Sequence, residues 1–342
     1  MNGFEWPWLA PAVALVMVCA LTPVVRRLLV ARQWLDYPDD RRQHDRPTPR
    51  GGGLAVLAGL AVALGILTRF DAGLWLLVGL VLALGGLGWL DDRYELSVRW
   101  RFLVQLAIAI VMVIVAGGIT ELRLGPWLLA SDWLWNVLAV IAAVWLINLH
   151  NFMDGADGLA SMQAVWTGLA FGAAFAWSGQ EIEAVVACSL AAAFAGFLIW
   201  NRPPARIFMG DSGSILLGGV VAWLAIAAAG KDGPGVAISS LICLVFVVDA
   251  TATLLRRLIR GERWYTPHRQ HAYQTLIGRG WRPGRVLALY ASVNLGLILP
   301  AMIVAMVYPA SDFWLAAGLA GVLVLGWWVV QSAEEGENET HD

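Results

Sequence analysis

The sequence predicts an all-α, polytopic integral membrane protein, and three features of the chain support this. Of its 342 residues, 59% are hydrophobic and only 14% are charged, whereas roughly a quarter of a soluble domain is charged. The mean hydropathy is +0.68, and apolar runs recur from one end of the chain to the other. The basic residues lie almost entirely in alternate connections between these runs. This composition excludes an ordinary soluble protein.

Each apolar run of about 20 residues is a predicted span, because that length of helix crosses a bilayer core about 30 Å thick. The runs lie at 8–30, 51–68, 73–90, 102–118, 133–149, 159–178, 182–200, 214–230, 235–255, 286–308 and 311–331. We therefore expect about eleven transmembrane helices. No basic residue precedes the first span, and Arg26 and Arg27 lie at its end. This pattern favours a permanent anchor with its N-terminus outside over a cleavable signal peptide.

The basic residues predict which side of the membrane faces the cytosol. With eleven spans, one side holds the connections 31–50, 91–101, 148–158, 201–213 and 256–285 together with the C-terminus. All but three of the 23 Lys and Arg residues lie on that side, the exceptions being Arg69, Arg123 and Lys231. The positive-inside rule makes this side cytosolic. We expect residues 1–342 to form one transmembrane catalytic domain, with an acidic, disordered tail at 332–342. The net charge of −2 by itself indicates nothing about nucleic acid, and with the basic residues placed in these membrane connections no nucleic-acid partner is expected.

The polar residues that could act on a substrate gather in four cytosolic segments, the first of which ends the third span. Asp91 and Asp92 are adjacent there, and Arg93, Arg99 and Arg101 follow. Two neighbouring carboxylates repel each other, so a cationic group should lie near them. The functional interpretation is a base or metal-positioning pair beside arginines that take an anionic headgroup. The alternative is a solvated charge cluster at a helix end.

The second segment, 148–161, reads NLHNFMDGADGLAS. It places Asn148, Asn151, Asp154 and Asp157 at spacings of three, which a continuing helix would stack on one face. Gly155 and Gly158 allow close approach of the backbone to a ligand. Such a polar cluster between two apolar spans is costly without a function. An ordinary polar turn is the alternative.

The third segment, 201–219, contains a glycine-rich turn that opens an apolar span. Gly210 to Ser214 would offer free N–H groups and the positive end of a helix dipole to an anion. Because Asp211 repels a phosphate, a divalent cation between the two is the natural solution. Mg²⁺ takes carboxylate and amide oxygens as ligands and usually keeps phosphate oxygens and waters as its other ligands. Mn²⁺ could take its place. The alternative is a simple N-cap at Asp211 or Ser212.

The fourth segment, 260–281, lies in the largest and most basic cytosolic connection. His268, Arg269 and His271 favour binding of a diphosphate or sugar over zinc, since no cysteine or third histidine is near. A lipid-facing basic patch is the alternative.

Three further residues add weaker indications. His44 and Arg50 lie in a Pro- and Gly-rich stretch before the second span and are candidate substrate-binding residues. Asp249, near the cytosolic end of an apolar helix, is either a functional carboxylate or the partner of Arg256 or Arg257.

Together these segments resemble the polyprenyl-phosphate N-acetylhexosamine-1-phosphate transferase family. The DD pair, N-x-x-D-G-x-D-G-L-A, F-M-G-D-x-G-S and a histidine-bearing last loop occur in family order between about residues 40 and 285. The resemblance implies transfer of a sugar 1-phosphate from a UDP-sugar to undecaprenyl phosphate, with release of UMP. It also implies a multi-pass protein of the bacterial inner membrane whose active site faces the cytosol. A homodimer is left open.

The resemblance assigns roles by matched position. Asp211 is the expected Mg²⁺ ligand, assisted by the amide of Asn151. Asp91 would deprotonate or align the lipid phosphate, with Asp92 beside it and Arg101 near that phosphate. The nucleotide site would be lined by Asp154, Asp157 and Phe208, and the sugar and diphosphate would be covered by His268, Arg269 and His271.

The last loop departs from the pattern of the muramoyl-pentapeptide enzymes. It reads PHRQHAYQ, without their triple histidine, and PTPRGGG precedes the second span. Both look closer to the branch that initiates O-antigen and other surface polysaccharides, with N-acetylglucosamine or a 6-deoxy relative as the sugar. The peptidoglycan step is one alternative. A transporter is another, but it would place ionisable groups near the bilayer midplane.

Overall fold

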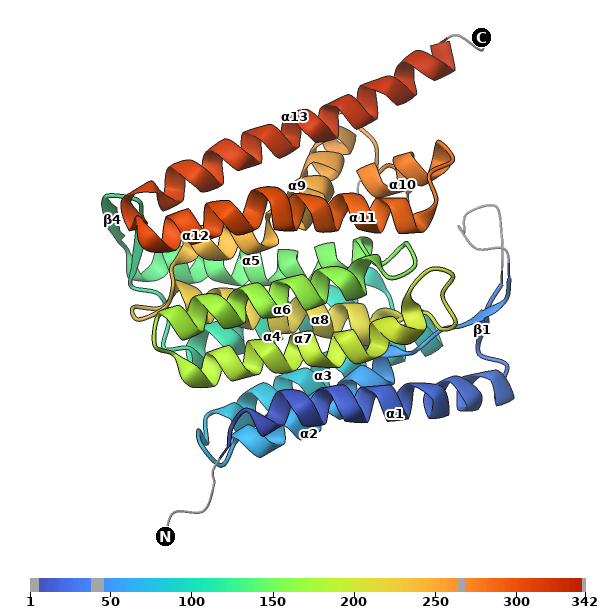
Figure 1. The fold of residues 1–342 in the computed structure, drawn as a ribbon, viewed down its shortest axis with the longest axis horizontal. Coiled ribbons are helices and arrows are strands. Elements are labelled where there is room, and N and C mark those ends of the chain that lie inside the picture. The colour runs from blue at the N-terminus through green and yellow to red at the C-terminus, as the bar shows by residue number, and fades with distance from the viewer. Residues whose placement is uncertain (1–5, 38–45, 264–267, 340–342) are drawn as a thin grey trace.

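The computed structural model describes residues 6–37, 46–263 and 268–339 and contains a bundle of helices (Figure 1). Within these residues, ten helices are long and apolar enough to cross a membrane. Nine are α1 (Leu9–Ala31), α3 (Leu74–Tyr94), α4 (Val98–Val115), α5 (Asp132–Phe152), α6 (Leu159–Trp177), α7 (Glu181–Asn201), α8 (Asp211–Ala229), α9 (Val236–Ile259) and α13 (Asp312–Glu339). The tenth is continuous through α11 (Pro283–Val293), the π-helix η1 (Asn294–Ile298) and α12 (Leu299–Val307).

The remaining predicted span, 51–68, corresponds to the shorter helix α2 (Gly53–Leu67), which has 15 residues. The prediction of an all-α polytopic membrane protein is therefore confirmed. A short helix, α10 (Ala272–Gly278), and the 3₁₀ turn η2 (Pro309–Ser311) complete the helical elements of the described residues. Helix α13 continues to Glu339, into the tail for which disorder was expected, since glutamate is a good helix former.

Two small antiparallel ribbons lie at opposite ends of the bundle (Figure 1). The first pairs β1 (Leu35–Asp36) with β2 (Thr48–Pro49), and the second pairs β3 (Glu121–Leu124) with β4 (Trp127–Ala130). The connections that join α3 to α4, α5 to α6 and α7 to α8 lie at the same end as β1 and α10 (Figure 1). The polar segments singled out in the sequence therefore share one end of the molecule.

Helix α8 is the centre of the bundle and packs against α3 and α5. Of its apolar window, 78% is buried inside the protein, whereas none of the corresponding window of α13 is buried. An apolar stretch of helix without buried residues suits contact with lipid, because hydrocarbon is as apolar as its side chains.

Two glycines bring neighbouring helices close to the N-terminus of α8. A Cβ atom at Gly88 of α3 would lie 2.1 Å from the backbone oxygen of Asp211, and one at Gly53 of α2 would lie 2.1 Å from the nitrogen of Gly213. No side chain fits at either position. The sequence thus permits backbone contact at the point where the polar segments of this chain meet, because small residues allow close helix packing.

Candidate active site

The candidate site forms around the N-terminus of α8. Gly210, with φ 72°, precedes the helix, and Asp211 is its first residue. The N–H groups of Asp211 and Ser212 donate to the carboxylate of Asp92, each at 3.0 Å. The alternative in which Asp211 or Ser212 caps its own helix is therefore wrong. These N–H groups are also not offered to a bound anion, because Asp92 supplies the negative charge that a helix N-terminus attracts.

Arg50 joins the two carboxylates at this helix end. Its Nε donates to Asp92 Oδ1 at 2.9 Å and its Nη2 donates to Asp211 Oδ1 at 2.7 Å. Backbone pairing places it there, since the N–H of Phe208 donates to the carbonyl of Pro49 at 2.8 Å. Loss of solvent lowers the pKa of Arg50, but the charges of Asp211, Asp92 and Asp154 outweigh this effect and raise it. Arg50 is therefore a permanent cation within the site.

Asp91 turns to a different set of donors. Its side chain accepts from the N–H of Leu96 at 2.9 Å and from Arg101. Glu95 adopts a left-handed conformation with φ 48° after α3, so the chain reverses and Arg101 of α4 returns to the end of α3. Arg101 also lies 3.8 Å from Asp211 Oδ2. The expected cation therefore lies beside each aspartate of the DD pair, Arg101 beside Asp91 and Arg50 beside Asp92. Because Asp91 is only 6% exposed, the alternative of a solvated charge cluster is excluded.

Asn151 connects α5 to the same helix end. Its amide nitrogen donates to Asp211 Oδ1 at 3.1 Å and to Ser214 Oγ at 2.9 Å. Asn148, one turn earlier, instead donates to Gln105 at 2.7 Å. The four polar residues of this segment do not share one helical face as expected, because α5 ends at Phe152. Asp154 and Asp157 lie in the glycine-containing turn that follows.

The turn after α5 holds two carboxylates in distinct surroundings. Asp157 accepts from the N–H of Ala205 at 2.8 Å and so ties this turn to the segment before α8. Burial raises the pKa of Asp154 well above its usual range, and Asp211, Asp92 and Asp157 raise it further against the opposing charge of Arg50. Burial and the neighbouring carboxylates therefore favour the protonated form of Asp154.

The donor set fits a divalent cation. Four carboxylates, those of Asp91, Asp92, Asp154 and Asp211, face two guanidinium groups, those of Arg50 and Arg101. The described part of the chain contains no group of three His, Cys, Asp or Glu side chains that could hold a metal by themselves. These oxygen donors would therefore hold Mg²⁺ only together with waters and substrate phosphate oxygens, which this ion usually keeps as its other ligands.

The segment that carries the two histidines packs over the turn after α5. The hydroxyl of Tyr273 donates to the carbonyl of Phe152 at 3.0 Å, and a Cβ at Gly155 would lie 2.1 Å from that hydroxyl. The rings of His268 and His271 have centroids 4.7 Å apart. His268 is half-buried and Arg269 is exposed, so both remain candidates for substrate contact. His44, the other predicted histidine, lies outside the described residues.

His271 is in the wall of this segment and not at its surface. It is 2% exposed and stacks on Phe152 and Tyr273. Its Nδ1 lies 3.8 Å from Asp249, which accepts from the N–H of Ala272 at 2.7 Å and from the hydroxyl of Tyr290 at 2.5 Å. The contact of His271 with the sugar and diphosphate remains a prediction, and in this structure its ring packs inside the segment. Asp249, which was predicted to be either a functional carboxylate or the partner of Arg256, Arg257 or a loop arginine, is thus bound to the start of α10 and to α11.

Sequence reasoning missed several residues that build the site. Tyr273 lies two positions after His271, and Ser214 belongs to the GDSGS motif, yet neither was assigned a contact. Gly88 was also overlooked, although it precedes the DD pair by three positions and small residues often mark close helix packing. The remaining predicted residue, Phe208, lies half-buried beside Arg50, with which it forms a parallel backbone bridge.

The chain is similar to several known proteins. The family described as "Glycosyl transferase family 4" matches residues 74–229. The "Probable undecaprenyl-phosphate N-acetylglucosaminyl 1-phosphate transferase" of Bacillus subtilis (strain 168) is 32% identical over 329 residues, which cover 92% of this chain and 88% of that protein. The "Undecaprenyl-phosphate alpha-N-acetylglucosaminyl 1-phosphate transferase" of Escherichia coli (strain K12) is 30% identical over 274 residues, which cover 75% of this chain and 72% of that protein.

A relative from another branch is also similar. The "Phospho-N-acetylmuramoyl-pentapeptide-transferase" of Geobacillus thermodenitrificans (strain NG80-2) is 28% identical over 314 residues, covering 84% of this chain and 94% of that protein. The similarity to the Bacillus relative extends over nearly the whole chain, including all the described segments of the candidate site. The chain thus belongs to the polyprenyl-phosphate N-acetylhexosamine-1-phosphate transferase family, whose members are membrane enzymes that transfer a sugar 1-phosphate to a polyprenyl phosphate.

Proposed function

We propose that this enzyme transfers N-acetylhexosamine 1-phosphate from a UDP-sugar to undecaprenyl phosphate and releases UMP. The reaction would take place at the cytosolic face of the bacterial inner membrane and would initiate a lipid-linked surface polysaccharide such as O-antigen. The observation that carries the proposal is the meeting of Asp91, Asp211 and two arginines at one end of the bundle. The names of the Bacillus and Escherichia relatives support undecaprenyl phosphate as acceptor and N-acetylglucosamine as the sugar.

The chemistry requires two anionic substrates to approach each other. An oxygen of the acceptor phosphate attacks the sugar-bearing phosphorus of the donor, a new phosphoanhydride bond forms, and the bond to UMP breaks. One phosphoanhydride replaces another, so the task of the protein is to position the groups and neutralise their charge. Arg50 and Arg101 can supply positive charge to the phosphates, since guanidinium groups match phosphate oxygens well.

Asp91 is proposed to align the acceptor phosphate or to take its proton. The second pKa of a phosphate monoester is about 6, so only a modest base is needed near neutral pH. The hydrogen bonds from Leu96 and Arg101 hold the Asp91 carboxylate in one orientation at the end of α3. A covalent aspartyl-phosphate at Asp91 is the alternative route. Trapping of labelled phosphate on the protein after incubation with donor alone would support that route.

Asp211 and Asn151 are the proposed holders of Mg²⁺. When bound, the ion would neutralise the charge that develops on the UMP leaving group. Arg50 donates to Asp211 Oδ1 at 2.7 Å, so this arginine compensates the charge of the carboxylate. Asp154, Asp157 and Phe208 are proposed to line the nucleotide side of the site, with His268 and Arg269 near the sugar and diphosphate.

The test is a donor panel with the purified full-length chain. Undecaprenyl phosphate and Mg²⁺ are incubated with UDP-N-acetylglucosamine, its 6-deoxy relatives and UDP-N-acetylmuramoyl-pentapeptide, and UMP release is scored. We expect turnover with an N-acetylhexosamine donor and none with the pentapeptide donor. Turnover with the pentapeptide donor alone would identify the peptidoglycan step, which the Geobacillus relative performs by its name. No UMP from any donor would refute the proposal.

A further inference from the structure

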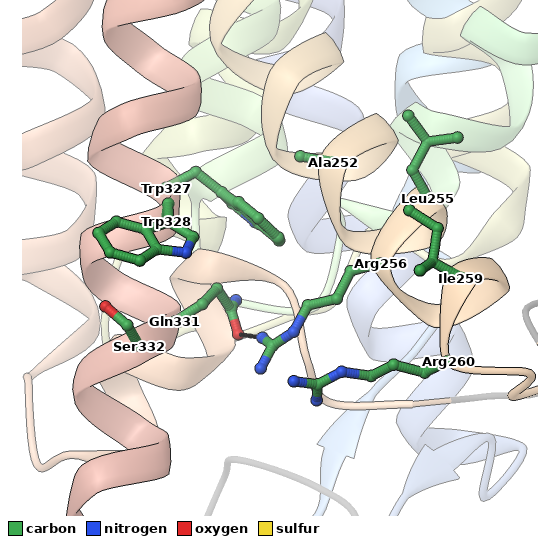
Figure 2. Close-up of a pocket in the computed structure, with 9 residues that line it drawn as sticks. All are labelled: Ala252, Leu255, Arg256, Ile259, Arg260, Trp327, Trp328, Gln331 and Ser332. Carbon is green, nitrogen blue, oxygen red and sulfur yellow. Dashed lines mark hydrogen bonds between the residues drawn. The ribbon is translucent and has the colours of Figure 1, made fainter.

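A pocket lies between α9 and α13, and none of the residues that line it belongs to the candidate active site. It has a volume of about 350 Å³ and is lined by nine residues (Figure 2). Arg256 of α9 and Arg260, which directly follows this helix, extend side by side toward α13, and Trp327, Trp328 and Gln331 come from α13 (Figure 2). The pocket belongs to the same end of α9 as the segment that leads to α10.

The lining of this pocket suits a phosphate group. Two of the nine residues that line it are arginines, and both carry their guanidinium groups toward α13 (Figure 2). The Arg256 guanidinium lies 6.0 Å from the centre of the Trp327 ring, and the indole N–H of Trp327 donates to Thr253 Oγ1 at 3.0 Å. The tryptophan is thereby fixed and holds the arginine in turn. A paired guanidinium site of this kind recognises phosphate oxygens.

The surroundings of the pocket suit a lipid. Leu255 and Ile259 of α9 are 52% and 85% exposed, and Trp328 of α13 is 60% exposed. Both helices are long and apolar enough to cross the membrane, so these apolar side chains face the hydrocarbon near its boundary. Tryptophan and arginine are favoured at that boundary, where a ring reaches the headgroup level and a cation meets anionic lipid.

We propose that this pocket binds the phosphate headgroup of an anionic phospholipid from the surrounding bilayer. Its position also links it to the histidine-bearing segment. Arg256 donates to the side-chain oxygen of Gln331, and the amide of Gln331 donates to the carbonyl of Gln270 at 2.7 Å. Gln270 lies between Arg269 and His271. The bound headgroup therefore stabilises this segment through Gln331, and this part of the inference rests on the proposed function.

The first experiment measures lipid binding without substrates. The full-length chain is placed in nanodiscs, and its association with spin-labelled phosphatidylglycerol is compared with that of spin-labelled phosphatidylcholine. Arg260→Gln is expected to lower the preference for phosphatidylglycerol roughly fivefold, the effect of one basic residue at an anionic membrane surface, and Arg256→Gln to lower it similarly. Arg27→Gln is the matched control, because Arg27 is an exposed arginine near the C-terminal end of α1 and does not line the pocket. An unchanged preference in Arg260→Gln, or an equal loss in Arg27→Gln, would overturn the proposal.

Competition identifies the source of the phosphate. Unlabelled phosphatidylglycerol is expected to displace the label, whereas millimolar inorganic phosphate and stoichiometric undecaprenyl phosphate are not. Displacement by inorganic phosphate would make this a site for a soluble anion. Displacement by undecaprenyl phosphate would assign the pocket to the acceptor substrate. Either result overturns the phospholipid proposal.

The second experiment tests the link to the histidine-bearing segment. Phosphatidylglycerol is expected to increase UMP release by the unmodified protein, because it stabilises this segment. Gln331→Leu is expected to bind the lipid equally well but to show no such increase. An increase that survives in Gln331→Leu would refute the link. Absence of UMP release under all conditions would refute the proposed function, while the substrate-free measurement still decides the binding site.

Discussion

The carboxylate of Asp92 accepts a hydrogen bond from the backbone N–H of Asp211 at 3.0 Å, although the two residues are 119 positions apart in the sequence. Together with Arg50 and the N–H of Ser212, this contact occupies both oxygens of Asp92. The two members of the DD pair therefore differ in their surroundings. We assign Asp92 to positioning α8 and leave the proposed alignment of the acceptor phosphate to Asp91.

The contact between Asp92 and α8 predicts the effect of Asp92→Asn. The amide retains one acceptor oxygen but turns its NH₂ group toward a backbone donor, so the variant should lose about 1–2 kcal/mol of unfolding free energy and most of its turnover. Thermal unfolding in detergent and UMP release measure both effects. Asp232→Asn, at an exposed acid, is the control. Equal stability of the two variants would contradict the capping role.

The approach of α3 to α8 predicts a difference between two neighbouring glycines. In Gly88→Ala the new methyl group collides with the backbone of Asp211, whereas at Gly86 nothing lies within 4 Å of the added Cβ. We expect Gly88→Ala to lose turnover and to unfold at lower temperature, because overpacking costs about 1–3 kcal/mol. Gly86→Ala should behave as the unmodified protein. The same UMP assay and melting curves check this, and full activity of Gly88→Ala would disprove the close approach.

The proposed roles of Asp91 and Asp211 predict separable losses. Asp211→Ala should abolish turnover and the dependence on Mg²⁺ together, since it removes the proposed metal ligand. Asp91→Asn should lower turnover strongly while nucleotide binding, measured by calorimetry with UMP, stays unchanged. A loss of UMP binding in Asp91→Asn would instead place this residue on the nucleotide side of the site.

Arg50 predicts a competition with the metal ion. Its guanidinium lies 2.7 Å from Asp211 Oδ1, where it repels an incoming cation and occupies a ligand oxygen. Arg50→Gln should therefore bind Mn²⁺ several-fold more tightly, as measured by electron paramagnetic resonance, while turnover falls because the phosphates lose a cationic partner. Weaker Mn²⁺ binding in this variant would show that Arg50 organises the metal ligands.

His271 predicts a dependence of stability on pH. Burial lowers the pKa of His271 to about 4, with Asp249 opposing and Arg257 adding to this shift, from about 6.5 in an unfolded chain. Between these values the unfolded chain binds the extra proton, so the free energy of unfolding decreases as the pH falls from 6.5 toward 4. The melting temperature should therefore fall between pH 7 and pH 5. His271→Asn, which keeps a residue suited to the N-cap, should show a smaller fall, and an equal fall would exclude His271 as a cause.

The sequence by itself determined the class of the protein, its spans and the segments that carry its chemistry. Hydropathy depends on local composition, so the eleven apolar runs correspond to the ten long helices and α2. The DD pair, the DGADG turn and the GDSGS turn were likewise visible in the sequence, because each is a polar group of residues between apolar runs.

Only the tertiary structure decided how these segments divide their roles. The capping of α8 by Asp92, the bridge from Arg50 to Asp211 and the burial of His271 each join residues from different elements. The spacing of residues along the sequence predicts none of these contacts. It also predicted that the polar face of α5 continues to Asp157, whereas the helix ends at Phe152. The physical reason is that carboxylates and backbone donors pair according to distance in space, and the packing of glycines at Gly53 and Gly88 brings these groups within that distance.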